Sequence, residues 1–154
     1  MSGSVALREV TAETLRAVLA LSVSPEQSTY VAPNAVSIAE AHFHPEAWFR
    51  AIYVGEEPAG FLMLHDENLK PDPEQDDFYF LWRMMVDERF QGHGVGRTAL
   101  ELLVAHVRSR PRARRLLTSC LPGEHSPEGF YLSCDFERTG VMLDDREIEL
   151  ARLL

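Results

Sequence analysis

The sequence predicts an α/β fold in which one mixed β-sheet is covered by helices on both faces. Three observations support this fold class. Strand-like and helix-like segments follow one another in the order β-α-α-β-β-β-α-β-α-β-β, some adjacent strands are joined by short turns, and helices interrupt these hairpins. Such an order indicates a mixed sheet rather than a doubly wound parallel one. With 154 residues, of which 45% are hydrophobic, the chain suits a single domain spanning 1–154.

The first three elements follow from local composition. Residues 4–10 have strand composition, and Thr11 is placed to cap a helix over about 12–21. A loop broken by two prolines comes next. Asn34 is then placed to cap a short amphipathic helix over 35–43.

The middle of the chain is predicted to form three strands. Residues 48–54 and 59–65 form a hairpin around the turn "GEEP". The polar stretch 66–77 contains two prolines and is expected to be a mobile connection. Residues 78–86 are expected to be a long central strand with one fully buried face, because their even-numbered members are all apolar.

The last third begins with a glycine-rich loop and a helix that runs to about Arg108. After a basic turn, interpreted as a solvated surface, 116–120 form a strand. A short helix over 126–134 is expected, with Ser126 as its N-cap and a proline at its first position. Residues 137–154 then form a hairpin around two aspartates.

The charge and the cysteine content narrow the classes of partner. Fifteen Lys and Arg against 24 Asp and Glu give a net charge of −9, which disfavours nucleic acid and anionic membranes and suits a cationic partner. Two cysteines, no signal peptide and no membrane-length apolar run predict a cytoplasmic protein with reduced thiols. No metal site is expected, because His42 and His44 lack a further pair of ligands at suitable spacing.

The glycines at 92, 94 and 96 lie between a strand end and a helix start, where main-chain N–H groups and the helix dipole favour an anion. We therefore expect the N–H groups of 92–97 to bind a phosphate group. The loop is not a Walker A motif, because Gln91 and Arg97 replace the required Gly and Lys. The spacing also differs from the dinucleotide fingerprint, which follows the first strand rather than the fourth.

These motifs resemble those of a known family. The segment "QGHGVG" (91–96) resembles the Gln/Arg-x-x-Gly-x-Gly/Ala signature of the GNAT acyltransferase superfamily. The segment "FYLSCDF" (130–136) resembles its second motif, Phe-Tyr-x-x-x-Gly-Phe, with Asp135 in place of the glycine. Asp tolerates the left-handed conformation better than most residues. The resemblance, which extends to the element order, implies an N-acetyltransferase that uses acetyl-CoA as its co-substrate.

The resemblance implies that main-chain groups of 92–97 hold the pyrophosphate of acetyl-CoA and that 84–86 run beside its pantetheine arm. The residues implied for acetyl-CoA binding are Met84, Met85, Val86, Gln91, Gly92, His93, Gly94, Val95, Gly96, Arg97 and Ser126. Tyr131 matches the family's general acid, which gives a proton to the departing thiolate. A purely packing role is the alternative for this tyrosine.

The general base is left open. Many members of the family carry a Glu on the long strand, where this chain has Phe80 or Trp82. Deprotonation of the amine then falls to water or to a carboxylate such as Asp77 or Glu40.

The segment "PEQSTYVAPNAVSIAEAHFH" (25–44) resembles the bacterial diamine and spermidine acetyltransferase branch of the superfamily. This resemblance implies a small amine acceptor, with Glu26 and Glu40 pairing with ammonium groups and Trp82 contacting the carbon chain. A solvated helix face is an equal interpretation of Glu40. Amino-acid, antibiotic and protein N-terminal acetyltransferases remain alternatives, as does an idle acyl-CoA-binding module. A homodimer through the C-terminal hairpin is possible.

Overall fold

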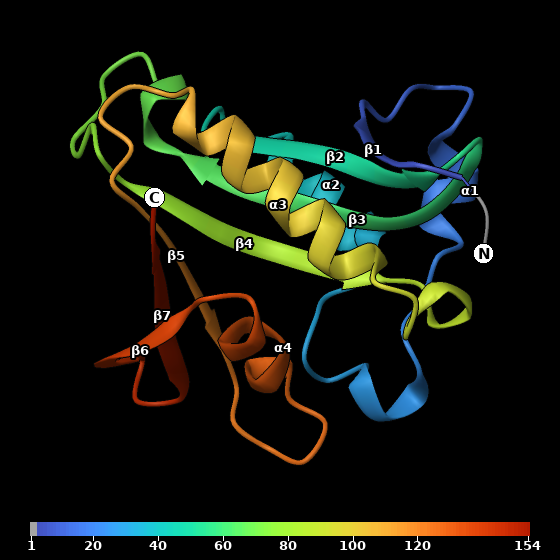
Figure 1. Cartoon of the computed structure of the whole chain (residues 1–154). Coiled ribbons are helices and arrows are strands. Elements are labelled where there is room, and N and C mark those ends of the chain that lie inside the picture. The colour runs from blue at the N-terminus through green and yellow to red at the C-terminus, as the bar shows by residue number, and fades with distance from the viewer. Residues whose placement is uncertain (1–2) are drawn as a thin grey trace.

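The computed structural model describes residues 3–154 and contains the predicted elements in the predicted order (Figure 1). In chain order they are β1 (Val5–Arg8), α1 (Leu15–Leu19), α2 (Asn34–Ala41), β2 (Ala47–Val54), β3 (Glu57–Asp66), β4 (Tyr79–Val86), α3 (Val95–Arg108), β5 (Arg115–Cys120), α4 (Glu128–Ser133), β6 (Glu137–Leu143) and β7 (Glu147–Leu153). Three short 3₁₀ turns lie between them: η1 (Pro25–Gln27), η2 (Glu67–Leu69) and η3 (Glu88–Phe90).

The strands form one mixed sheet of seven strands in the order β1-β2-β3-β4-β5-β7-β6. All neighbouring pairs are antiparallel except β4 and β5, which are parallel. This parallel pair is joined at only two positions, Phe80 with Leu117 and Leu81 with Thr118. Beyond Leu81 the two strands are no longer paired, and the sheet is divided there.

Helices cover both faces of the sheet, as the sequence predicts. On one face, α3 packs its buried stripe against the sheet, and residues of α4 join the same core cluster. The stripe has the three- and four-residue spacing of an amphipathic helix and consists of Val95, Ala99, Leu100, Leu103, Val104 and Val107. On the other face, residues of α1 and α2 pack against a second, smaller cluster. Figure 1 shows α3 lying across the middle strands, with α1 and α2 behind them.

The expectation of one fully buried face on β4 is wrong, and a β-bulge is the reason. Met63 of β3 pairs with Arg83 while the next residue, Leu64, pairs with Leu81, so Trp82 is the extra residue. A bulge of this kind exchanges the two faces of a strand. Before it, the odd-numbered Tyr79 and Leu81 are buried in the α3 core, whereas beyond it the even-numbered residues pack there.

Several predicted caps also differ from the structure. Helix α1 begins at Leu15 rather than near residue 12. The buried Asn34 donates its side-chain N–H to the carbonyl oxygen of Val18 (3.0 Å) and so links α2 to α1 instead of capping its own helix. Helix α4 begins at Glu128 with Pro127 as its N-cap, one residue later than predicted.

The polar segment after β3 is more fixed than the sequence suggests. Asp66 is buried and accepts a 2.6 Å hydrogen bond from Arg110. Glu67 accepts hydrogen bonds from His65 (2.8 Å) and from the N–H of Glu74 (2.9 Å), which lower the pKa of its carboxyl to about 2. Among residues 3–154, no helix combines the length and the hydrophobicity that crossing a membrane requires.

Candidate active site

A cleft of about 460 Å³ opens where β4 and β5 separate. One side consists of the end of β4, the glycine loop (residues 91–96) and the first turn of α3. The other side consists of β5, the start of α4 and the segment around η1. Its lining residues are Val23, Gln27, Tyr30, Val31, Leu81, Trp82, Arg83, Met84, Met85, Val86, Phe90, Gln91, Gly92, Gly94, Val95, Gly96, Arg97, Thr118, Ser119, His125, Ser126, Pro127, Phe130 and Tyr131.

The glycine loop exposes its main chain. Gly92 (φ 79°) and Gly94 (φ 80°) are left-handed, a conformation in which other residues are strained. A Cβ at either position would meet no atom within 4 Å, so these glycines are required by the backbone conformation and not by crowding. Gly94 is the N-cap of α3. The N–H groups of the first helical turn lack partners within the helix and lie at the positive end of its dipole. This turn lines the cleft.

Gly96 serves a different purpose. A Cβ there would lie 3.3 Å from two ring carbons of Phe130, which is tighter than an ordinary contact. The absence of a side chain at this position thus lets α4 approach α3. Because Phe130 precedes Tyr131, Gly96 also helps to set the position of the predicted general acid.

Gln91 and Arg97 use their side chains within the protein. The Gln91 side-chain N–H donates to the carbonyl oxygen of Val86 (2.8 Å) and to the side chain of Gln27 (2.9 Å), which returns a hydrogen bond of 3.2 Å. Arg97 donates to the carbonyl and hydroxyl oxygens of Ser133, both at 3.1 Å. His93 is exposed and is not among the residues that line the cleft.

Tyr131 lies in the cleft wall but is only 5% exposed. Its ring meets those of Phe130 and Phe136 edge-on, each at a centroid distance of 5.4 Å. Burial raises the pKa of the Tyr131 phenol, and the Thr118 side chain beside it opposes that shift. Asp135, in the place of the family's glycine, has φ 69°, so the left-handed turn expected there is confirmed.

Ser126 is a lining residue that also shapes the entry to α4. Its hydroxyl donates to the carbonyl oxygen of Leu121 (2.6 Å) and accepts from the N–H of Glu128 (3.2 Å). The hydroxyl thus binds a main-chain N–H at the start of α4, but the N-cap is Pro127 and not Ser126 as predicted.

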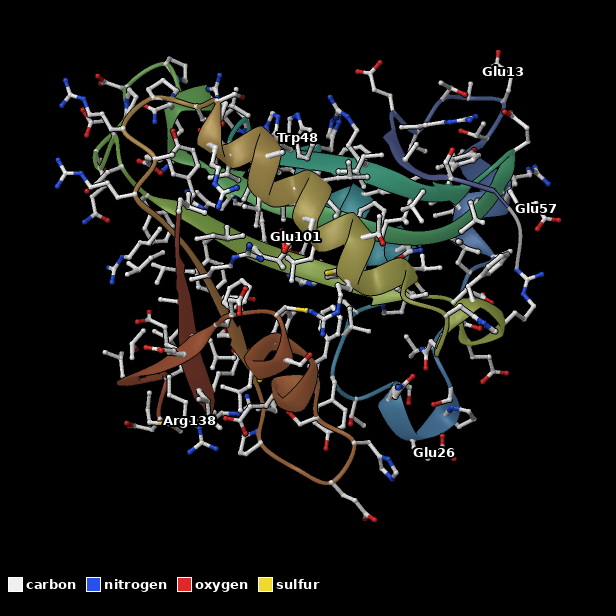
Figure 2. The ribbon with its side chains drawn as sticks, viewed as in Figure 1. Glu13, Glu26, Trp48, Glu57, Glu101 and Arg138 are labelled. Atoms are coloured by element: carbon white, nitrogen blue, oxygen red, sulfur yellow. The ribbon has the colours of Figure 1, made fainter. Side chains whose placement is uncertain are left out.

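The predicted acceptor residues are only partly brought together. Trp82 lines the cleft, but Glu26 and Glu40 do not. Figure 2 shows Glu26 at the periphery, on the η1 turn. Glu40 accepts from Arg83 at 3.3 and 3.4 Å, and that arginine does line the cleft. Within the described part of the chain, no Asp or Glu side chain lines the cleft.

Sequence reasoning missed Gln27, Thr118, Ser119 and His125, all of which line the cleft. Thr118 and Ser119 carry a recognisable signal, because they are adjacent polar residues in an otherwise apolar strand. Side chains of consecutive strand residues point to opposite faces. A strand with polar residues on both faces is therefore a candidate for the edge of a cleft.

The comparison with protein families decides the identity of this fold. Residues 12–136 match the Acetyltransferase (GNAT) family. The chain belongs to this family. The acetyltransferase predicted from its two motifs is thereby confirmed, and the cleft described above is its candidate active site.

Relatives and solved structures agree with this assignment. The acetyltransferase is 28% identical over 145 residues to a spermine/spermidine N(1)-acetyltransferase of Bacillus subtilis, covering 90% of this chain and 91% of that one. A crystal structure of an acetyltransferase from Thermus thermophilus has a TM-score of 0.73 at 20% identity, covering 98% of this chain and 97% of the other. The aminoglycoside acetyltransferase AAC(6′)-Ib, solved in complex with coenzyme A, has a TM-score of 0.75 at 16% identity, covering 97% and 95%. Both structural likenesses show the fold.

Proposed function

We propose that this acetyltransferase moves the acetyl group of acetyl-CoA to the primary amine of a small acceptor, with a polyamine or diamine favoured. One observation carries the proposal. A single cleft joins a glycine loop with exposed main-chain N–H groups to a buried tyrosine, Tyr131, on the opposite side. That arrangement supplies an anion-binding end and a proton donor for one extended ligand.

The residues of the donor side fit coenzyme A. The N–H groups of 92–97 would hold the pyrophosphate, because the left-handed glycines leave them open and the dipole of α3 favours negative charge. The main chain of 84–86 would lie beside the pantetheine arm, since β4 is unpaired on the β5 side beyond Leu81. Arg97 would add positive charge from the first turn of α3. Ser126 faces the same cleft from the start of α4.

Bound acetyl-CoA supplies the activated acyl group, and the chain's own groups manage the proton. The raised pKa keeps Tyr131 protonated at neutral pH, so it can donate a proton to the departing sulfur. The same burial makes the phenol a weaker acid, because the phenolate that results is poorly solvated. The Thr118 side chain beside the phenol opposes that rise in pKa. Thr118 also donates to the carbonyl oxygen of Leu81 (3.0 Å), which fixes its hydroxyl between β4 and β5.

The acceptor class rests on relatives and on charge. A relative covering most of the chain is named for spermine and spermidine, and the net charge of −9 attracts cations. Arg83 favours a second class of acceptor, an amine that also carries a carboxylate, because this arginine lines the cleft and no carboxylate of the described residues does. Its guanidinium meets Glu40 through one nitrogen only, and a carboxylate on an amine substrate would pair with it well.

An amine panel tests the proposal. Thiol release from acetyl-CoA is measured with spermidine, putrescine, amino acids and an aminoglycoside, beside direct binding of acetyl-CoA. We expect acetyl-CoA to bind and at least one small amine to be acetylated, with polyamines fastest. Faster turnover of amino acids would favour the second class. Binding without turnover of any amine would contradict the proposed function.

A further inference from the structure

The proposed reaction needs a group that takes the proton of the acceptor ammonium, and neither carboxylate suggested by the sequence is placed to do so. Asp77 lies in a separate hollow near the start of β4, beside Arg114 and Arg115. Glu40 is engaged by Arg83 and does not line the cleft. Within residues 3–154, therefore, a carboxylate could accept a proton from the cleft only through another residue that lines it.

Glu147 occupies such a position. Ser119 lines the cleft, and its hydroxyl donates a 3.1 Å hydrogen bond to Oε1 of Glu147. Ser119 lies on β5 next to Thr118, whose side chain lies beside Tyr131, and the side chains of Ser119 and Thr118 point to opposite faces of the sheet. Glu147 is the first residue of β7, which pairs with β5, and it is half-buried.

Among residues 3–154, no ion pair engages the carboxylate of Glu147. Its Oε1 instead accepts from the Ser119 hydroxyl, near the end of β5. Arg138, on the neighbouring strand β6, is paired with Glu128 (2.9 Å). Figure 2 labels Arg138 beside the C-terminal hairpin.

A neighbour provides a natural contrast. Glu149 lies two residues further along β7, on the same side of the strand. Its carboxylate accepts from the hydroxyl of Thr139 on β6 (2.8 Å), which is the edge strand of the sheet. Although Glu149 is the residue paired with Ser119 in the register of β5 and β7, the Ser119 hydroxyl donates to Glu147 and the Glu149 carboxylate binds Thr139 at the sheet edge.

We propose that Glu147, acting through the hydroxyl of Ser119, receives the proton of the acceptor ammonium. The ammonium N–H bond breaks as a new O–H bond forms on Ser119 Oγ, and the original Ser119 proton passes to Glu147 Oε1. Nitrogen keeps the electron pair and can attack the thioester carbonyl. Serine is regenerated, and Glu147 ends neutral. This inference rests on the proposed function and assigns the proton acceptor that the long strand lacks.

The test compares Glu147→Gln with Glu149→Gln, using two amines. The first amine is the one that the wild-type enzyme acetylates fastest, which is putrescine for a diamine acceptor. The second is its analogue with two fluorines β to each nitrogen (2,2,3,3-tetrafluoroputrescine for putrescine), whose electron-poor amines are both largely neutral at neutral pH. We expect Glu147→Gln to lower kcat for the first amine by roughly 100-fold, in the range of general base catalysis, and to lower it far less for the second. Glu149→Gln should leave both rates near wild type.

The pattern separates a proton acceptor from a structural residue. An equal loss with both amines, or no loss with either, would overturn the inference. Ser119→Ala should show the same dependence on the amine, and adding it to Glu147→Gln should cost little more, because groups that act as a unit are not additive. Additive losses would contradict the relay. A wild-type enzyme that binds acetyl-CoA but turns over no amine would instead contradict the proposed function itself.

Discussion

The two sides of the cleft, which we propose bind acetyl-CoA (the donor wall) and the amine (the acceptor wall), are held in different ways. The donor wall, formed by 84–97, is fixed by backbone conformation, with left-handed Gly92 and Gly94 exposing main-chain groups. The acceptor wall, formed by 27–31 and Ser119, is fixed by side chains. Gln27 is bound to Gln91, and Tyr30 packs so closely on Gly123 that a Cβ there would lie 2.2 Å from its hydroxyl oxygen. A main-chain site suits a constant ligand, whereas side-chain contacts allow the acceptor to vary.

The largest expected effect lies where the two walls meet, at Tyr131. Tyr131→Phe removes the proton donor and keeps the ring, so we expect kcat to fall by roughly 100-fold or more while the Kd of acetyl-CoA stays near wild type. Because burial raises the phenol pKa above its usual value of 10, the wild-type rate should show no decline from Tyr131 ionisation below about pH 10. Steady-state kinetics across pH and calorimetric binding measure both. A fall in binding as large as the fall in rate would indicate a packing role.

An intermediate effect is expected where one wall supports the other. Gln27→Ala removes two hydrogen bonds with Gln91, each of which contributes about 1 kcal/mol. We therefore expect KM for the amine to rise a few-fold and the Kd of acetyl-CoA to stay unchanged. Gln91→Ala also frees the carbonyl of Val86 and should weaken acetyl-CoA binding as well. If each variant weakened binding of the amine and of acetyl-CoA to the same extent, the two walls would not act independently.

The smallest effect is expected at Glu40 and Glu26, two carboxylates that neither line the cleft nor bind Ser119. Glu40→Gln breaks the pair with Arg83, in which the side chains are 36% and 19% exposed, and such pairs contribute about 0–1 kcal/mol. We expect kcat/KM for putrescine to change by less than about threefold, and Glu26→Gln to change nothing. A tenfold loss in Glu40→Gln would show that this residue contacts the acceptor directly.

The sequence predicts the donor wall better than the acceptor wall, and the reason is physical. Most residues are strained in the left-handed conformation. The glycine loop and the turn at Asp135 can therefore be recognised from a single sequence. The order of helices and strands can also be predicted, because burial of one face of an element gives its sequence a periodic pattern of hydrophobic residues.

The acceptor wall depends on contacts between residues far apart in the sequence. The bulge at Trp82 changes which side chains of β4 face each core, and alternation of apolar residues gives no sign of it. The place of Glu40 on a helix predicts a free carboxylate, but Arg83 engages it. The link from Ser119 to Glu147 forms only because β5 and β7 are paired. Such relations exist in the folded sheet and not in a local pattern.

The most direct test measures binding of coenzyme A and of pantetheine, which lacks the diphosphate, to wild type, Gly94→Ala and Gly129→Ala. Gly129 is an open helical glycine without positive φ and serves as the matched control. If main-chain groups of the glycine loop hold the diphosphate, Gly94→Ala should weaken coenzyme A binding by roughly 10-fold, for a strain of about 1–2 kcal/mol, and leave pantetheine and the control unchanged. Wild-type affinity of Gly94→Ala for coenzyme A, or an equal loss for pantetheine, would contradict the account.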